Sequence, residues 1–175
     1  LFLFSNIILA QTFSLDVGGK VESGGKKLDG AIITIYKSSS VAQQVTTSAN
    51  GKFNLKLESN NDYIMTVTKP GFINKRFEIT TKNVPGKRAE AGFAGFEITV
   101  TIFEAQKNVD YSILNDPIAK ISYDPASEDF TFDEAYTRSM LDAIAKLKAL
   151  EEQSRKVEAE KVKENTQAAS QQAQA

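Results

Sequence analysis

Residues 52–72, KFNLKLESNNDYIMTVTKPGF, decide the fold of this chain. Apolar side chains alternate with polar ones in both halves of the stretch, at Phe53, Leu55, Leu57, Tyr63, Met65 and Val67. A period of two residues is the pattern of a β-strand with one buried face and one solvated face. A polar break at residues 59–62 separates the halves, and the turn dipeptides Asn50-Gly51 and Pro70-Gly71 flank them. The stretch therefore predicts a β-hairpin.

Five other segments have the character of strands: residues 13–21, 31–37, 45–47, 74–80 and 96–103. Residues 31–37, AIITIYK, are apolar on both parities, which predicts a central strand covered on both faces. Gly18-Gly19 interrupts the first segment and predicts a bulge or a close approach of another backbone. Polar loops are expected at residues 38–40 and 82–95. Seven short strands with turn signals between them favour a β-sandwich over residues 11–104.

A long helix is expected after the sandwich. Residues 105–130 predict a connector with a possible extra strand at 118–123, and residues 131–166 predict the helix. Either a Thr131–Glu134 capping box or Asp133 as the cap begins it. Tyr136, Met140, Ile144 and Leu147 share one apolar face, which predicts docking on the sandwich or on a partner. Charge pairs then predict a solvated stalk, followed by a low-complexity tail at residues 167–175.

The composition limits the chemistry. The chain has 0 His and 0 Cys, which excludes an imidazole base, a thiolate nucleophile, disulfides and metal sites built on these residues. The formal net charge of −1 gives no sign of nucleic-acid binding. We therefore predict no cofactor and no nucleic-acid partner.

Residues 1–10, LFLFSNIILA, are almost wholly apolar. They are too few to span a bilayer, which takes about 20 residues. The segment fits the remnant of a secretory signal peptide, and a buried first strand is the alternative. The first interpretation predicts an exported protein of the periplasm or cell surface with no transmembrane span.

Four short motifs carry a family resemblance. They are Val17-x-Gly19-x-Val21, Leu28-Asp29-Gly30-Ala31, Thr47-x-x-Asn50-Gly51-x-Phe53 and Lys69-Pro70-Gly71-Phe72. In this order they resemble the carboxypeptidase regulatory-like domain, over residues 13–81. The resemblance implies a seven-stranded, prealbumin-like (transthyretin-like) Greek-key sandwich, in a module that is usually non-catalytic. Residues 117–125 and 132–136 are similar to uncharacterised bacterial envelope proteins that carry this domain. A hydrolase of purine breakdown shares the fold, but its site needs His.

Several residues are candidates for function. Phe93 lies in a Gly- and Ala-rich loop with Lys87 and Arg88 nearby, which predicts a partner-contact patch. The apolar helix face is a second possible contact, for a partner or for self-association. Ser38 to Ser40 are read as a loop rather than as a nucleophile. The only carboxylate cluster fits turns and helix caps better than a calcium site, and it comprises Asp116, Asp124, Glu128, Asp129, Asp133 and Glu134.

The function expected from these observations is a non-catalytic, exported structural or interaction module of the cell envelope that contacts other envelope proteins. An accessory domain of a secreted peptidase or glycan-active enzyme is the first alternative. A carbohydrate-binding module is the second, although the chain has 0 Trp and most of its aromatic residues fall at inward positions.

Overall fold

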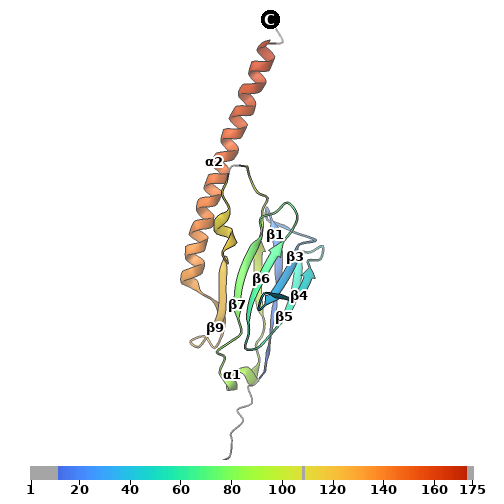
Figure 1. Ribbon diagram of the computed structural model, residues 1–175, viewed down its shortest axis with the longest axis vertical. Helices are drawn as coiled ribbons and strands as arrows, with labels where there is room; N and C mark the ends of the chain where they lie inside the picture. Colours follow the sequence, from blue (N-terminus) through green and yellow to red (C-terminus); the bar gives the residue numbers. More distant parts are fainter. Residues whose placement is uncertain (1–11, 108, 173–175) are drawn as a thin grey trace, which may run out of the picture.

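The computed structural model describes residues 12–107 and 109–172 (Figure 1). The segment interpreted as a signal-peptide remnant, residues 1–10, lies outside them. Within the described residues, ten strands form two sheets that face each other, and a long helix runs alongside them and projects past one end (Figure 1). The protein is thus mainly a β-sandwich with a long C-terminal helix, as the sequence predicts.

The smaller sheet is organised around one strand. β1 (Ser14–Ser23) pairs antiparallel with β2 (Lys26–Lys27) and β5 (Lys52–Glu58), and parallel with β8 (Phe96–Thr101). Gly18-Gly19 permits the close approach of β8. Of the two features predicted for this pair, the close approach of another backbone is the one observed. A Cβ on Gly19 would lie 2.0 Å from the carbonyl oxygen of Ile98.

The larger sheet has six strands in the order β10-β9-β7-β6-β3-β4, and only the β7–β9 pair is parallel. Their bounds are β3 (Ile32–Lys37), β4 (Ser40–Thr46), β6 (Asp62–Thr68), β7 (Lys75–Thr80), β9 (Ala119–Asp124) and β10 (Asp129–Phe132). β3 lies between β4 and β6, so it is central in the sheet. Ile33 and Ile35 are fully buried on its inner face. On the outer face Thr34 is buried but Tyr36 is only half-buried, so the predicted cover is full on the inner face and partial on the outer face.

The inner faces of the two sheets form one core. The apolar residues at the alternating positions of residues 52–72 are all buried. They are Phe53, Leu55, Leu57, Tyr63, Met65 and Val67. The predicted alternation is therefore confirmed as a division between core and surface.

The expected number of seven strands is wrong. β2, β9 and β10 complete the ten, and β9 is the extra strand expected in the connector. β4 is also longer than the predicted residues 45–47, because Ser38 and Ser39 form a tight turn with φ of 49° and 67° and the strand begins at Ser40. The loop expected at residues 82–95 contains the short helix α1 (Gly86–Ala91).

The C-terminal helix α2 (Glu134–Gln172) has 39 residues, a length of about 58 Å. It begins after Asp133, whose Oδ1 accepts a hydrogen bond from the Tyr136 backbone N–H at 2.9 Å. Asp133 is therefore the cap, while Thr131 lies in β10 and forms no capping box. The helix continues past residue 166, where the sequence predicted its end. Before it, the connector includes the 3-10 helix η1 (Ser112–Asn115).

Candidate interaction surface

The first part of α2 docks on the body. Met140 and Leu147 are 6% and 5% exposed, and Ile144 is half-buried. The Tyr136 hydroxyl donates a hydrogen bond of 2.6 Å to the Pro117 carbonyl. The face proposed for partner contact is thus used within the chain, against the sandwich and its connector. Of the two predicted roles of this face, docking on the sandwich is the one observed.

The connector holds the middle of α2. The Tyr111 hydroxyl donates to Glu151 Oε1 at 2.7 Å and accepts the Gln106 backbone N–H at 2.9 Å. Three positions further along the helix, the Ser154 hydroxyl donates to the Lys107 carbonyl at 3.1 Å. Glu151 is therefore bound to the connector, and Arg155, four residues later, pairs with Glu152 instead.

A hollow of about 560 Å³ lies where the connector meets the helix. Leu150 and Val157 line it from α2, and Val109 lines it from the connector. Leu150 and Val157 are 53% and 44% exposed, and their spacing of two helical turns places them on one face. We call these three residues the joint hollow. They form an apolar strip at the point where the helix leaves the body, and polar residues complete the hollow, namely Asp110, Gln153, Ser154, Glu158 and Lys161.

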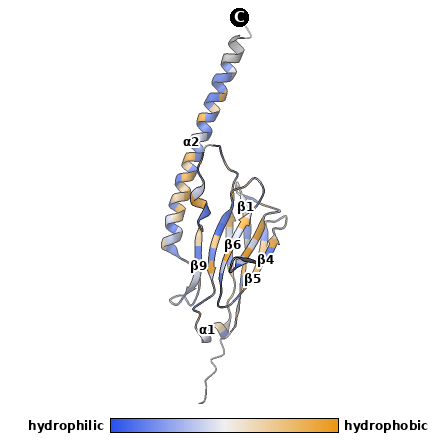
Figure 2. Ribbon diagram, viewed as in Figure 1, coloured by the Kyte–Doolittle hydropathy of each residue, from blue (hydrophilic) through white to orange (hydrophobic). Residues whose placement is uncertain are grey.

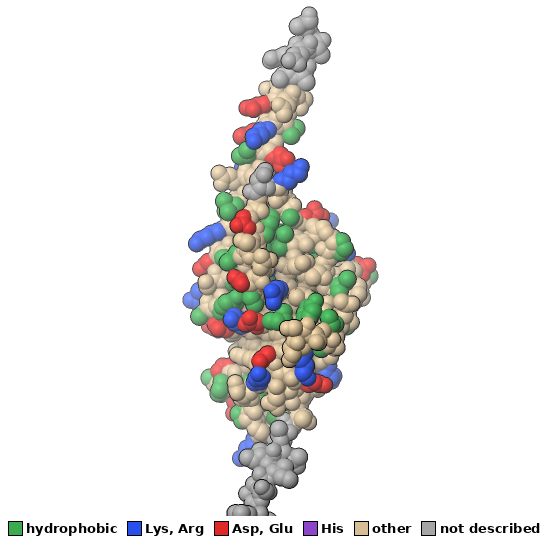
Figure 3. All heavy atoms as spheres, in the orientation of Figure 1, with side chains coloured by type: hydrophobic (Ala, Val, Ile, Leu, Met, Phe, Trp, Pro, Cys, Tyr) green, Lys and Arg blue, Asp and Glu red, His purple; other side chains and the backbone are tan. Residues whose placement is uncertain are grey.

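Beyond the joint hollow, α2 is a stalk in contact with solvent. Figure 2 shows mostly hydrophilic residues along it, and Figure 3 shows side chains of both charges with isolated hydrophobic ones between them on the face in view. Glu152 pairs with Arg155 and, at 3.7 Å, with Lys156. Among the described residues, no helix is long and apolar enough to cross a membrane.

Phe93 is not a free contact residue. Its ring centroid lies 5.1 Å from that of Phe13 and 4.8 Å from that of Phe130, and the Arg88 guanidinium lies 4.0 Å from the ring centroid. Arg88 also donates to the Glu128 carbonyl at 2.6 Å. Phe93 and Arg88 are thus held within the fold and are both half-buried, because the loop folds over the end of the core. A partner patch at this surface stays a prediction. Lys87 is exposed.

The predicted acidic cluster is dispersed. Asp124 accepts hydrogen bonds from Ala126 and Ser127 within its own turn, and Asp133 caps α2. Among residues 12–107 and 109–172, no group of three or more acidic side chains is placed to hold a metal ion. The turns and the cap account for Asp124 and Asp133.

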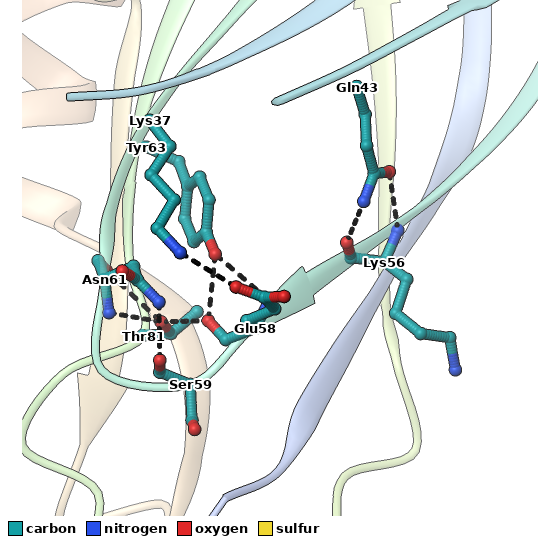
Figure 4. A network of polar contacts seen from close by, with 8 residues as sticks. All are labelled: Lys37, Gln43, Lys56, Glu58, Ser59, Asn61, Tyr63 and Thr81. Atoms are coloured by element: carbon teal, nitrogen blue, oxygen red, sulfur yellow. Dashed lines mark hydrogen bonds and ion pairs between the residues drawn. The ribbon is translucent and has the colours of Figure 1, made fainter. Parts of the chain in front are cut away.

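A polar network closes one end of the sandwich (Figure 4). The Tyr63 hydroxyl donates to the Glu58 carbonyl and accepts its backbone N–H, both at 3.1 Å. The Thr81 hydroxyl donates to the same carbonyl at 2.7 Å and accepts the Asn61 backbone N–H at 3.0 Å. These bonds join the turn between β5 and β6 to the end of β7. The residues of this network therefore have a structural role.

Gln43 links the two sheets beside this network (Figure 4). From β4 its side-chain amide donates to the Lys56 carbonyl of β5 at 2.5 Å and accepts the Lys56 backbone N–H at 3.3 Å. The amide thus makes the two hydrogen bonds that a neighbouring strand would make, and it satisfies backbone groups of Lys56 at the edge of the smaller sheet. Sequence analysis missed this role, because nothing local distinguishes Gln43 from Gln44.

Lys75 is a buried cation that sequence analysis also missed. Its side chain is 1% exposed, and its Nζ lies 4.5 Å from the ring centroid of Phe103. The pKa of Lys75 is lowered to about 8, chiefly by burial and secondly by repulsion from Lys148, with attraction to Glu151 opposing both. The sequence carries a signal for this position, since Lys75 shares the parity of the apolar Phe77 and Ile79 in the strand expected at residues 74–80.

Comparison with known proteins gives matches to solved structures alone. No protein-family model and no curated protein matches the chain. A catechol 1,2-dioxygenase from an Acinetobacter species is 11% identical, with a TM-score of 0.39 over 64% of this chain and 59% of that one. A 3-chlorocatechol 1,2-dioxygenase from Rhodococcus opacus is 9% identical, with a TM-score of 0.36 over 53% and 60%. The dioxygenase domain of a carbohydrate-binding fusion from a Streptomyces species is 16% identical, with a TM-score of 0.35 over 69% and 75%.

These matches contradict the prediction that the chain is not an enzyme, because the matched structures are dioxygenases or a dioxygenase domain. That prediction is withdrawn. The chain spans about 60% of the length of the first two, and at 9 to 16% identity the likeness concerns the fold alone. It assigns no reaction to any residue described above.

Proposed function

We propose that this chain is an exported interaction module of the cell envelope, in which the sandwich holds a helical stalk that contacts another protein. The observation that carries the proposal is the change in α2 at the joint hollow. Before it, the apolar face is buried on the body; after it, the helix continues to Gln172 as a stalk.

The stalk has little to stabilise it alone. About 17 residues follow Arg155, and isolated helices of that length are marginal in water. A helix that is polar on all sides typically bridges between domains or depends on many charge pairs. Leu150 and Val157 offer an apolar contact at its base, beside Val109. These features favour a partner that packs its own apolar side chain into the joint hollow.

We also propose that the sandwich is of the carboxypeptidase regulatory-like type. The support is the way the four motifs meet. The buried Thr47 hydroxyl donates to the Leu28 carbonyl at 2.8 Å and accepts the Ala31 backbone N–H at 2.9 Å. Val21 N–H donates to the Gly51 carbonyl at 2.9 Å. The Lys69 ammonium donates to the carbonyl of Asp29, beside Leu28, at 2.7 Å, so the motifs lie together although they are far apart in sequence.

Site-specific photo-crosslinking in native cells tests the stalk proposal. A crosslinker at position 157 should give a discrete adduct, because Val157 lines the joint hollow. The same crosslinker at Ala159, about 200° around the helix, is the matched control and should give little. The adduct at 157 should be lost with Leu150→Glu, while the melting temperature stays unchanged because Leu150 is exposed.

Sedimentation of the purified chain distinguishes the kind of partner. A concentration-dependent dimer abolished by Leu150→Glu would identify a second copy as the partner. A monomer together with an adduct of larger mass in cells would identify a different protein. Equal adducts at positions 157 and 159, or none at either, would refute the proposed contact.

A further inference from the structure

The outer face of the six-stranded sheet is hollowed along its length. Two adjoining hollows, of about 990 and 690 Å³, lie over it and share Tyr36, Thr66 and Arg76. The first extends toward Ser38 and the start of α2, and the second extends toward η1. We call the combined surface the outer groove. It lies on the side of the sheet opposite the core.

Strand parity places these three side chains in the groove. Ile35, before Tyr36, and Met65, before Thr66, are fully buried in the core, so the residues that follow them face outward. Thr66 lies directly opposite Arg76 in the pairing of β6 with β7. The groove thus has a hydroxyl and a guanidinium side by side at its centre, with an aromatic ring on the neighbouring strand β3.

Most of the other charges that border the first hollow are paired with a charge of opposite sign, whereas Asp133 and, in the second hollow, Asp110 are acids that accept hydrogen bonds from backbone N–H groups. Lys82 pairs with Asp62 at 2.5 Å, and Lys120 pairs with Glu78 at 3.0 Å. Asp133 accepts the N–H of the third helical residue and caps α2. Arg76 differs from all of these, because it takes part in no ion pair among the described residues.

The guanidinium of Arg76 has N–H donors that make no hydrogen bond within the described part of the chain. Its NH1 makes one bond of 3.3 Å to the Asn115 carbonyl, and its Nε is buried without a hydrogen-bond partner in the described part of the chain. A guanidinium is a planar fork of five donors that matches the two oxygens of a carboxylate. The centre of the groove is therefore electrostatically suited to an anionic group.

The backbone of the groove floor excludes one mode of ligand binding. β3, β6 and β7 are each paired on both sides. A peptide could not add to them as a further strand, since that mode needs a free edge. The ligand must be held by side chains alone. Hydroxyl groups line much of the groove and suit a sugar's hydroxyls, and they come from Ser38, Ser39, Thr66, Thr80 and Ser122.

We propose that the outer groove binds an acidic oligosaccharide, with the carboxylate of one uronic acid on Arg76 and a sugar ring against Tyr36. The groove is open and long, which suits a chain of several sugars rather than a small enclosed molecule. None of the three residues of the joint hollow lines the outer groove, although Asp110 borders both hollows.

Titration calorimetry with oligogalacturonate tests the proposal on the full chain. The matched ligand is the methyl ester of the same oligosaccharide, which keeps every ring and removes the negative charge. The free acid should bind, and the ester should bind at least about tenfold more weakly, because the charge-assisted bond is lost. Binding of the acid should also weaken as salt is raised.

Two variants and one control locate the site. Arg76→Gln should weaken binding of the acid about tenfold or more and leave the weak binding of the ester unchanged. Tyr36→Ala should weaken both ligands. Lys52→Gln, an exposed cation on the other sheet, should change neither. Melting temperatures establish that each variant is folded, and chemical-shift mapping on the unmodified chain locates the ligand without any substitution.

Several results would overturn the proposal. These are no binding of the acid at millimolar concentration, equal binding of acid and ester, and shifts confined to the smaller sheet. An acidic peptide that binds the outer groove more tightly than the acidic sugar would also overturn it.

Discussion

Replacing Lys75 with methionine should stabilise this protein. Methionine keeps the length of the apolar stem and removes an amine that is 1% exposed. No ion pair among the described residues includes Lys75; its Nζ lies over the Phe103 ring. A charge buried with so little compensation opposes folding.

The size of the effect follows from the pKa. The fold lowers the pKa of Lys75 from 10.5 to about 8, and each unit corresponds to about 1.36 kcal/mol. The full shift would oppose folding by about 3 kcal/mol, and solvent screening at the amine reduces this to about 2 kcal/mol. Loss of the cation–π contact with Phe103 reduces this stabilisation by about 1 kcal/mol. We therefore expect a net gain of about 1 to 2 kcal/mol at pH 7.

The pH dependence has a definite sign. Because the folded pKa of Lys75 is depressed, the unfolded chain binds more protons than the native chain between about pH 8 and pH 10.5. The contribution of Lys75 to stability should therefore rise with pH across this window. The penalty is present in full below it. Lys75→Met should lack this rise, so the difference between variant and parent should shrink from pH 7 to pH 10.

Urea unfolding at pH 7, 8.5 and 10 measures both effects, with Lys87→Met as a control on an exposed lysine. The control should follow the parent at every pH. A Lys75→Met variant that is less stable than the parent at pH 7 would refute the reasoning. So would a stability difference that does not change with pH.

Two further predictions concern packing. Phe93→Ala should lower the free energy of unfolding, measured in urea, by about 3 kcal/mol, because the Phe93 ring packs on Phe13 and Phe130. An unchanged stability would instead favour Phe93 as a partner-contact residue. Gly19→Ala should lower the melting temperature far more than Gly18→Ala, with a loss of about 2 to 3 kcal/mol for Gly19→Ala. The added methyl at Gly19 meets backbone, whereas at Gly18 it meets the side chain of Glu97; equal losses would contradict this.

The alternation in residues 52–72 determined a local property, the side of each strand that faces the core. Hydrophobic patterning is sufficient for this, since one face of a strand must leave water wherever the strand is placed. The amphipathic start of α2 was readable for the same reason. Docking of Met140 and Leu147 on the body was one of two outcomes that this pattern allowed.

Tertiary structure alone decided the partners of each residue. β9 joins the large sheet by parallel pairing with β7, a contact between segments about 40 residues apart that no local signal encodes. Phe93 looked like an exposed loop residue because its packing partners, Phe13 and Phe130, are distant in sequence. Arg76 and Thr66 meet through strand register, and Lys75 meets Phe103 at the end of the sandwich. Local sequence determines which faces are apolar; pairing and packing over long distances determine which charges lose their solvent and which surfaces remain for a ligand.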